Sequence, residues 1–363
     1  MSSDKSETEA YTEERRLLEV EQCEPALEAI HAGEYETAKE IFETLADEGN
    51  LTAKLDLARL HLRELINLPD LGLAVSLLHE ASNLGMSDAS DALGSVYEDG
   101  EGVAQNLAQA LKFYRLAADQ ASTNGMFNLG RCYLFGIGLR QHTANAIIWL
   151  GKAAHSDHAL ACYWMGGLYV NGRHIEPDRT MAANFYERGA VLGHSYSQNK
   201  LGIFYQDGTG RDKNLKQAFH LFRLSADSEN EWGQFLLGCM YLEGSYVEQD
   251  FDSAIELFTL SAEQGLVDAQ VKLGTMYGKG TGVPVDRARS IELYEAAATQ
   301  GSAVANFNLG IIFLNGDGVK QDVDFGVRYI EQAARLGMID AKEVLLTLKK
   351  QYGIDSAETP TLQ

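Results

Sequence analysis

Small and apolar residues recur along the chain with a fixed period of 36 residues. A glycine, usually preceded by leucine, stands at seven positions with no insertion between them: Gly94, Gly130, Gly166, Gly202, Gly238, Gly274 and Gly310. An aromatic residue follows each glycine after three positions, and a second glycine follows after six. Self-similarity at a fixed period of about 20–50 residues is typical of solenoids. The pattern therefore predicts a repeat protein.

Each unit of the pattern reads as two antiparallel helices. The Leu-Gly pair and the aromatic residue three positions later share one face of a first helix. The second glycine ends that helix, where a left-handed residue is favoured. A short polar side chain six residues later suits the N-cap of a second helix, at Asn106, Asp178, Asn214, Asp250, Asp286 and Asp322. The second helix then carries a small residue, a bulky apolar pair and an alanine, as in Ala110, Phe113–Tyr114 and Ala118. The fold class predicted is all-α.

The first glycine of each unit lies inside its helix, where glycine is unfavourable by about 0.5–1 kcal/mol relative to alanine. Seven such glycines in register indicate a compensating contact. We expect a neighbouring helix to approach so closely at each of them that a Cβ atom would not fit.

The repeated pattern resembles a known family. Leu-Gly-x-x-Tyr-x-x-Gly-x-Gly-Val, then Asp, then Ala-x-x-aromatic-aromatic-x-x-Ala-Ala is similar to the Sel1-like repeat, a relative of the tetratricopeptide repeat. Thr281-Gly282-Val283 and Asp317-Gly318-Val319 match the loop closely, and the resemblance covers roughly residues 86–340. It implies a right-handed superhelical α/α solenoid. His174 and Tyr246 replace the second loop glycine and Arg211 replaces the loop valine, so those loops should be less regular.

The same frame gives the expected domain organisation. We expect nine helix pairs plus one cap helix, divided as a disordered acidic N-terminus (1–12), tetratricopeptide-like or degenerate Sel1-like repeats (13–85), seven repeats of 36 residues (86–338), a C-terminal capping helix (339–352) and a disordered tail (353–363). In the last helix Leu346 takes the glycine position and Lys349 the tyrosine position. A polar outer face at this end suits a cap, since nothing stacks beyond it.

Charge and cysteine usage limit which classes of binding partner and which cellular locations are expected. The formal net charge is −22, and residues 1–60 hold sixteen Asp and Glu against six Lys and Arg. Such a field repels nucleic acid and anionic membranes, and it favours either a basic partner or solubility alone. No run of about 18 apolar residues predicts a membrane span, and no secretory segment is evident. The four cysteines are Cys23, Cys132, Cys162 and Cys239. They show no repeated pairing along the chain, so we expect free, buried thiols and a cytoplasmic location.

Candidate chemistry is sparse. The glycine-rich loops lack the Gly-Lys-Ser/Thr end of a phosphate-binding loop, and the loop at Asn315–Gly318 departs from the spacing of a calcium-binding EF-hand. His155 and His158 flank a turn without the further ligands that zinc requires. No nucleophile elbow, zinc-protease or acyl-transfer motif occurs. The sequence therefore predicts no catalytic activity, no cofactor and no metal.

The candidate binding residues follow from the resemblance. In the tetratricopeptide arrangement the first helix of each pair lines the concave surface, so its exposed positions would lie six and three before the glycine and one, four and five after it. We call these five the inner positions. The partner-binding candidates among them are Phe127, Arg131, Phe135, Tyr163, Tyr196, Asn199, Asp207, Trp232, Phe235, Glu243 and Phe307.

These candidates differ in what the repeat itself explains. The family often carries an aromatic residue three before the glycine, so Phe127, Tyr163, Phe235 and Phe307 also fit ordinary packing between helices. Phe135, Tyr196 and Trp232 lie where the repeat demands no aromatic residue. Aromatic and arginine side chains dominate binding hot spots. Glu98, Asp99, Asp207 and Glu243 would give the groove an acidic edge.

Three functions remain open at this stage. The first is a non-catalytic adaptor or scaffold that binds a basic or amphipathic segment of a protein or peptide in the groove. The second is an immunity or inhibitor protein that neutralises a cognate toxin or enzyme, a use that the resemblance also implies. The third is a hydrolase that recognises β-lactams, for which no acyl-transfer residues are evident. The oligomeric state is left open.

Overall fold

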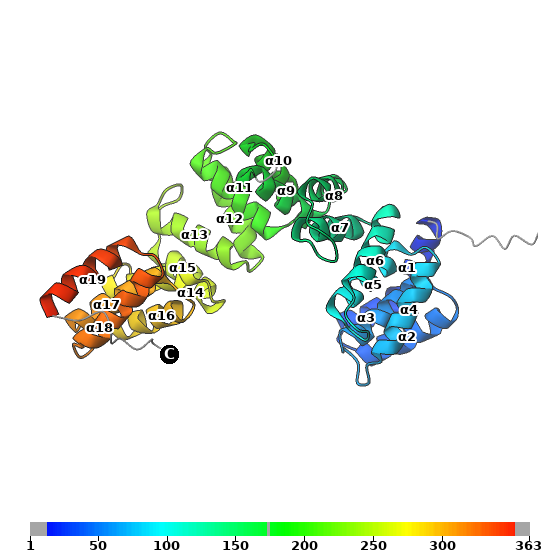
Figure 1. The fold of residues 1–363 in the computed structure, drawn as a ribbon, viewed down its shortest axis with the longest axis horizontal. Coiled ribbons are helices and arrows are strands. Elements are labelled where there is room, and N and C mark those ends of the chain that lie inside the picture. The colour runs from blue at the N-terminus through cyan, green and yellow to red at the C-terminus, as the bar shows by residue number, and fades with distance from the viewer. Residues whose placement is uncertain (1–12, 173–174, 353–363) are drawn as a thin grey trace, which may run out of the picture. The chain divides into compact units, whose positions relative to one another are not determined.

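The chain is built from consecutive pairs of α-helices (Figure 1). The computed structural model describes residues 13–172 and 175–352, and within that part of the chain it contains 19 helices. In chain order they are α1 (Glu13–His31), α2 (Tyr35–Asp47), α3 (Leu51–Leu62), α4 (Leu71–Asn83), α5 (Ser87–Asp99), α6 (Leu107–Asp119), α7 (Thr123–Phe135), α8 (Thr143–His155), α9 (Ala159–Asn171), α10 (Arg179–Val191), α11 (Ser195–Asp207), α12 (Leu215–Asp227), α13 (Glu231–Glu243), α14 (Phe251–Glu263), α15 (Val267–Lys279), α16 (Arg287–Thr299), α17 (Ala303–Asn315), α18 (Val323–Arg335) and α19 (Ile339–Tyr352). The prediction of an all-α solenoid with nine pairs and a final helix is confirmed.

The chain divides into two compact units, unit 1 at residues 1–192 and unit 2 at residues 193–363. In the pairs from α5 onward the odd-numbered helix, here the A helix, carries the glycine of the series, and the even-numbered B helix packs against it. Each B helix within a unit also contacts the next A helix. The A helices α5 and α7 touch each other in unit 1, as do α11 and α13 in unit 2. We call the outer surface of the A helices within a unit its A-helix face.

Polar caps fix where the helices begin and end. At all six predicted N-caps a side-chain oxygen accepts a hydrogen bond from a backbone N–H in the first turn, as Asn106 does from Gln109 at 3.1 Å. Gly100, which ends α5, is left-handed with φ 81°, and the equivalent glycine ends each A helix from α7 to α17. These contacts satisfy backbone groups that a helix end otherwise leaves unpaired.

The seven glycines of the series lie against the bulky residues of the B helices. A Cβ atom added at Gly94 would lie 2.3 Å from the ring of Tyr114, and one added at Gly202 would lie 2.4 Å from the ring of Phe222. The other five face Leu150, Tyr186, Phe258, Tyr294 and Ile330 in the same way, at 2.5–3.1 Å. The expected close approach is confirmed, and its partner is the second residue of each bulky pair.

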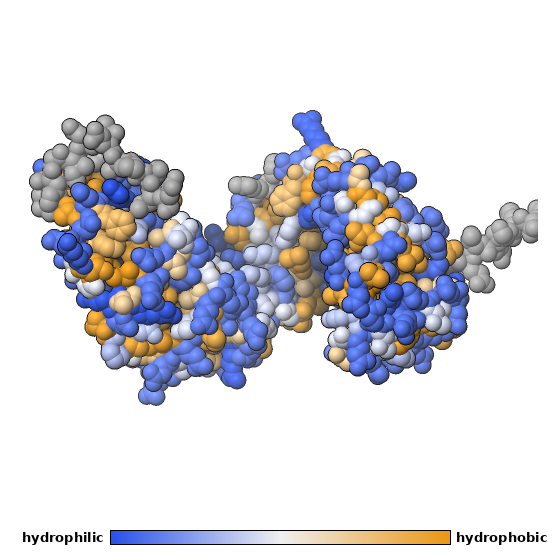
Figure 2. Space-filling view, turned by 90° about the horizontal axis from the view of Figure 1, so that it is seen from below, coloured by the Kyte–Doolittle hydropathy of each residue, from blue (hydrophilic) through white to orange (hydrophobic). Residues whose placement is uncertain are grey.

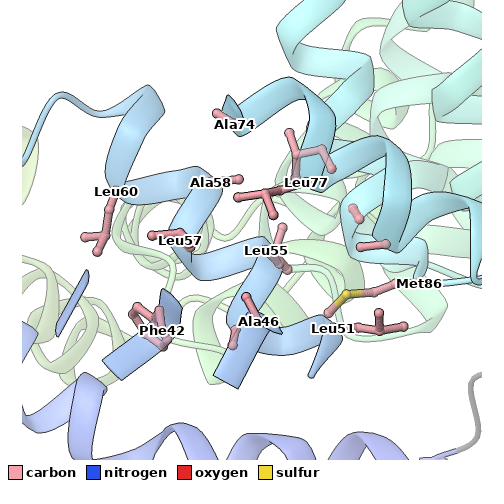
Figure 3. Close-up of a cluster of buried hydrophobic side chains, with 14 of the residues drawn as sticks. Phe42, Ala46, Leu51, Leu55, Leu57, Ala58, Leu60, Ala74, Leu77 and Met86 are labelled. Atoms are coloured by element: carbon pink, nitrogen blue, oxygen red, sulfur yellow. The ribbon is translucent and has the colours of Figure 1, made fainter. Parts of the chain in front are cut away.

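The N-terminal helices share one hydrophobic core. Phe42 on α2, Leu57 on α3 and Leu77 on α4 point into it (Figure 3), and all three are buried. A carboxylate also joins α1 to α3, because Glu19 Oε2 accepts hydrogen bonds from the backbone N–H groups of Leu51 and Thr52 at 2.9 and 3.2 Å. These contacts tie α1 to α3 within unit 1.

The opposite end of the chain is closed by α19. Ala341 and Leu348 are buried against α18, whereas Leu346 is 63% exposed. On the face that Figure 2 presents, hydrophobic residues lie scattered among hydrophilic ones. All four cysteines are free thiols; three are buried and Cys239 is half-buried. The predictions for residues 1–12, 353–363 and His174 fall outside the described residues.

Candidate functional site

A groove of about 520 Å³ lies in unit 1 between the helices α3, α5 and α7. The helix α5 supplies Asp88, Asp91 and Ser95 to its wall, and these are inner positions of the first full repeat, at six and three before and one after Gly94. The other lining residues are Arg59, Leu62, Arg63, Ala92, Val96, Glu101 and Asn124. Charged side chains therefore surround a floor of apolar ones.

Asp91 is the most perturbed carboxylate of the groove. Its Oδ1 accepts a hydrogen bond from Asn128 Nδ2 on α7 at 2.8 Å. Burial raises the pKa of Asp91 to about 6, and the neighbouring charge of Asp88 acts in the same direction, against the lowering effect of Asn128. A carboxylate whose pKa is raised by burial is a marker of functional sites, although structural networks produce the same effect.

Two ion pairs engage Asp88 and Arg59, which line the groove. Arg16 on α1 donates to Asp88 Oδ2 at 3.0 Å, and Arg59 on α3 donates to Asp56 Oδ1 at 2.8 Å. Burial nevertheless leaves the pKa of Asp56 raised. Asp88 and Arg59 are thus already neutralised by internal partners.

Arg131, a candidate binding residue, is engaged inside unit 1. Its guanidinium donates to both carboxylate oxygens of Glu98, with Nη1 at 2.8 Å from Oε1. The Tyr114 hydroxyl also donates to Glu98, at 2.8 Å. Burial alone would raise the pKa of Glu98, but the hydrogen bonds from Arg131 and Tyr114 outweigh it and the pKa is lowered. Arg131 and Glu98 therefore join α7 to α5 beside the groove.

An aromatic cluster lies on α7 and α9. Phe127 stacks on His158 with 4.6 Å between ring centroids and meets the edge of Trp164 at 5.1 Å. Phe135, two turns further along α7, contacts the same Trp164 at 5.5 Å and is 62% exposed. We call Phe127, Phe135, His158 and Trp164 the aromatic cluster. The helix α7 contributes to both features, with Asn124 lining the groove and Phe127 and Phe135 in the aromatic cluster.

The remaining candidate of unit 1 packs against its own repeat. Tyr163 is half-buried, with 6.0 Å between its ring centroid and that of Tyr186. Burial raises the pKa of Tyr163. This contact matches the packing role that the repeat suggests for that position.

In unit 2 the candidates fall on α11, α13 and α17. Tyr196 is 41% exposed, and its hydroxyl donates to Glu231 Oε1 at 2.8 Å. Trp232 is half-buried and meets Phe235 at 6.0 Å. Asn199 is buried, and its Nδ2 donates to Asn230 Oδ1 at 2.8 Å. Tyr196 and Asn199 of α11 thus contact the start of α13, the helix on which Trp232 and Phe235 lie.

Three candidates of unit 2 lie apart from that group. Phe307 on α17 is half-buried and packs against the core that α18 and α19 share. Asp207 and Glu243 are exposed at the ends of α11 and α13. Their position suits the acidic edge that the sequence predicts, and their binding role remains a prediction.

Sequence reasoning missed several residues of this face. Asp88 and Asp91 occupy inner positions but were not among the candidates, and applying the same five positions to the Gly94 repeat would have found them. Trp164 lies two residues before its glycine, so the repeat frame gave no signal for it. His158 was considered only as a possible zinc ligand; its Nδ1 caps α9 by accepting from the Ala161 backbone N–H at 3.1 Å, and its ring stacks on Phe127.

The described part of the chain was searched for metal-ligand clusters and for membrane-spanning helices. Among residues 13–172 and 175–352, no group of three or more His, Cys, Asp or Glu is placed to hold a metal ion. None of the helices described there is long and apolar enough to cross a bilayer.

Comparison with known proteins identifies the class. The Sel1 repeat family model matches seven successive segments, at residues 87–122, 123–158, 159–194, 195–230, 233–266, 267–302 and 303–338. The chain therefore belongs to the Sel1 repeat family, and no catalytic family is identified for it. A search of curated proteins finds no match.

Two solved structures share both fold and sequence with this chain. One is c5321, a protective antigen present in uropathogenic Escherichia coli strains with an SLR fold, at 28% identity and a TM-score of 0.61, covering 88% of this chain and 76% of c5321. The other is a Sel1 repeat protein from Oxalobacter formigenes, at 26% identity and a TM-score of 0.62, covering 85% of this chain and 89% of that protein.

Proposed function

We propose that this Sel1 repeat protein is a non-catalytic adaptor or scaffold that binds a basic or amphipathic segment of a partner protein on its A-helix face. The observation that carries the proposal is that α7 contributes both to a charged groove and to the aromatic cluster, whose Phe135 ring is exposed. Sel1 repeats generally mediate protein binding.

The two features supply complementary parts of an interface. Phe135 offers a large exposed ring held edge-on by Trp164, so it loses little rotamer freedom on binding. Rigid aromatic anchors of this kind carry much of the energy of protein interfaces. The net charge of −22 attracts a basic partner and speeds its encounter.

Affinity capture with matched variants tests the proposal. Phe135→Ala removes the exposed ring of the A-helix face, whereas Leu260→Ala removes an apolar side chain of similar exposure from the B helix α14. We expect one defined partner to be retained by the natural protein and by Leu260→Ala, and lost with Phe135→Ala. Equal retention by both variants would exclude the A-helix face of unit 1 as the binding surface.

Salt dependence tests the charge argument separately. The Debye length falls from about 8 Å at 0.15 M salt to about 3 Å at 1 M. A basic partner should therefore dissociate at high salt. A partner that stays bound at 1 M salt would show that the acidic charge serves solubility alone.

An inhibitor of a basic toxin or enzyme would use the same face, and the net charge of −22 suits such a target equally. The distinction is functional: an inhibitor abolishes the activity of the captured protein at equimolar ratio, whereas an adaptor leaves that activity intact. A cytoplasmic location remains a prediction; fractionation of cells that produce the protein tests it.

A further inference from the structure

Asp91 is the carboxylate of the groove whose charge is least compensated inside the protein. Asp88 and Arg59 are held in ion pairs with Arg16 and Asp56. Among the described residues Asp91 forms no ion pair, and its hydrogen bond comes from the neutral amide of Asn128. The positive charges of Arg59 and Arg131 act on Asp91 from beyond ion-pair distance, and burial outweighs them.

This arrangement is unfavourable for the empty protein. A half-buried carboxylate loses hydration, and here the hydrogen bond from Asn128 and the charges of Arg59 and Arg131 replace it only in part, so burial leaves the pKa of Asp91 raised. An asparagine would make the same contact with Asn128 and avoid the penalty. The carboxylate is therefore better explained by a cation supplied from outside.

The rest of the groove matches the stem of a basic side chain. Leu62, Ala92 and Val96 supply apolar surface to the lining of the groove, beside its charged residues. Lysine and arginine bury their methylene groups along such a surface while the charged end reaches a carboxylate. The volume of about 520 Å³ falls within the range of about 300–1,000 Å³ typical of ligand sites.

We propose that this groove binds an arginine or lysine side chain of an extended partner segment, with Asp91 as its charge partner and the aromatic cluster as the site for a nearby apolar residue of the same segment. The inference rests on the proposed function and specifies the chemistry of the partner. Arg63, exposed at the α3 end of the groove, is the one guanidinium lining it that no ion pair in the described structure occupies, and it disfavours a second basic residue at that end.

A pair of synthetic peptides tests this. The probe is acetyl-Ala-Arg-Ala-Phe-Ala-amide, and the comparison peptide carries citrulline, which has the shape of arginine without its charge. Binding is followed by NMR through the side-chain amide of Asn128, which donates to Asp91. We expect the arginine peptide to bind at least about tenfold more tightly than the citrulline peptide, because a hydrogen bond to a charged group is worth more than a neutral one.

Two isosteric variants assign the effect. Asp91→Asn should abolish the preference for arginine, whereas Asp207→Asn, which removes the same charge from unit 2, should preserve it. Circular dichroism confirms that both variants are folded. Equal binding of the two peptides by the natural protein, or an undiminished preference in Asp91→Asn, overturns the proposal.

The outcome is separable from that of the proposed function. If the peptides bind equally while partner capture still depends on Phe135, the cationic site is wrong and the binding face stands. If the arginine peptide binds through Asp91 while partner capture is insensitive to Phe135→Ala, the cationic site stands and the proposed binding face is wrong.

Discussion

The glycines of the series stabilise the helix pairs because, lacking a side chain, they let the B helix pack closely against the A helix. At Gly202 a Cβ atom would lie 2.4 Å from the ring of Phe222, whereas at Gly151, inside α8, the nearest atom would be 4.0 Å away. Gly202→Ala should therefore destabilise unit 2 by about 1–3 kcal/mol through overpacking. Gly151→Ala, the control, should stabilise its helix by about 0.5–1 kcal/mol. Urea unfolding measures both, and the same sign for the two variants would contradict the packing role.

Asp91 gives a second prediction at this scale. Its folded-state pKa is raised to about 6 from an ordinary value of 3.8, so the folded protein binds more protons than the unfolded chain between these values. Its ionisation thus lowers stability above about pH 6, and the penalty disappears as pH falls toward 4. Asp91→Asn should stabilise unit 1 on the order of 1–2 kcal/mol at pH 7 and have little effect near pH 4.

Urea midpoints of the natural protein and of Asp91→Asn at the two pH values measure this difference. A stability gain that is independent of pH would show that the carboxylate carries no burial penalty. Asp207→Asn again serves as the control, since that side chain is exposed.

Single residues also show how far the sequence reaches. The glycine contacts could be predicted because the same glycine position recurs seven times in one register. The contacts of Arg131 and Trp164 could not be predicted in the same way. Their partners, Glu98 and Phe135, lie on neighbouring A helices, and these pairs do not recur from repeat to repeat. Side-chain pairing across repeats depends on geometry that the spacing alone does not contain.

At the scale of the helix, three histidines serve as N-caps. His142, His158 and His194 each accept a backbone N–H through Nδ1 at the start of α8, α9 and α11. Histidine is not among the preferred N-cap residues, so this role could not be predicted from residue type. An imidazole can accept there only when Nδ1 is unprotonated.

His194 makes α11 sensitive to pH. Burial lowers the pKa of His194, so the unfolded chain binds a proton more readily than the folded one. Stability of unit 2 should be full above the ordinary histidine pKa of about 6.5 and fall as pH decreases below it. His194→Asn keeps a capping oxygen without the titration and should reduce the fall between pH 7.5 and 5.5. An identical pH profile for the two proteins, measured by urea unfolding, would exclude the cap as its source.

For the whole molecule, the final helix decides how the repeat array ends. Val327 and Ile330 of α18 are buried beneath α19. Deletion of residues 339–363 should expose this apolar surface and promote self-association. It should also lower the free energy of unfolding of unit 2 by several kcal/mol, because each large side chain that is uncovered costs about 1.5–3 kcal/mol. Deletion of residues 353–363 alone, which leaves α19 in place, is the control. Sedimentation velocity and thermal unfolding read out both effects, and a monomeric, equally stable product of the longer deletion would contradict the capping role.

The array as a whole was the part most open to prediction. The number of helix pairs, their alternation and the terminal helix all followed from one spacing repeated without insertion. The binding face could be predicted only in part. The repeat frame indicates which positions face outward, but it does not indicate which of those side chains contact one another. Tyr196 and Trp232, for instance, occupy equivalent positions in adjacent repeats, yet one hydrogen-bonds Glu231 and the other packs on Phe235.

The separation between the glycine contacts and the exposed inner positions has a consequence for engineering. Gly94 and Tyr114 pack a helix pair together, whereas the position of Phe135, which is 62% exposed, carries Asn171, Asp207 and Glu243 in the next three repeats. A substitution at such an exposed position can therefore change what the surface recognises while the contacts that hold each helix pair together stay in place.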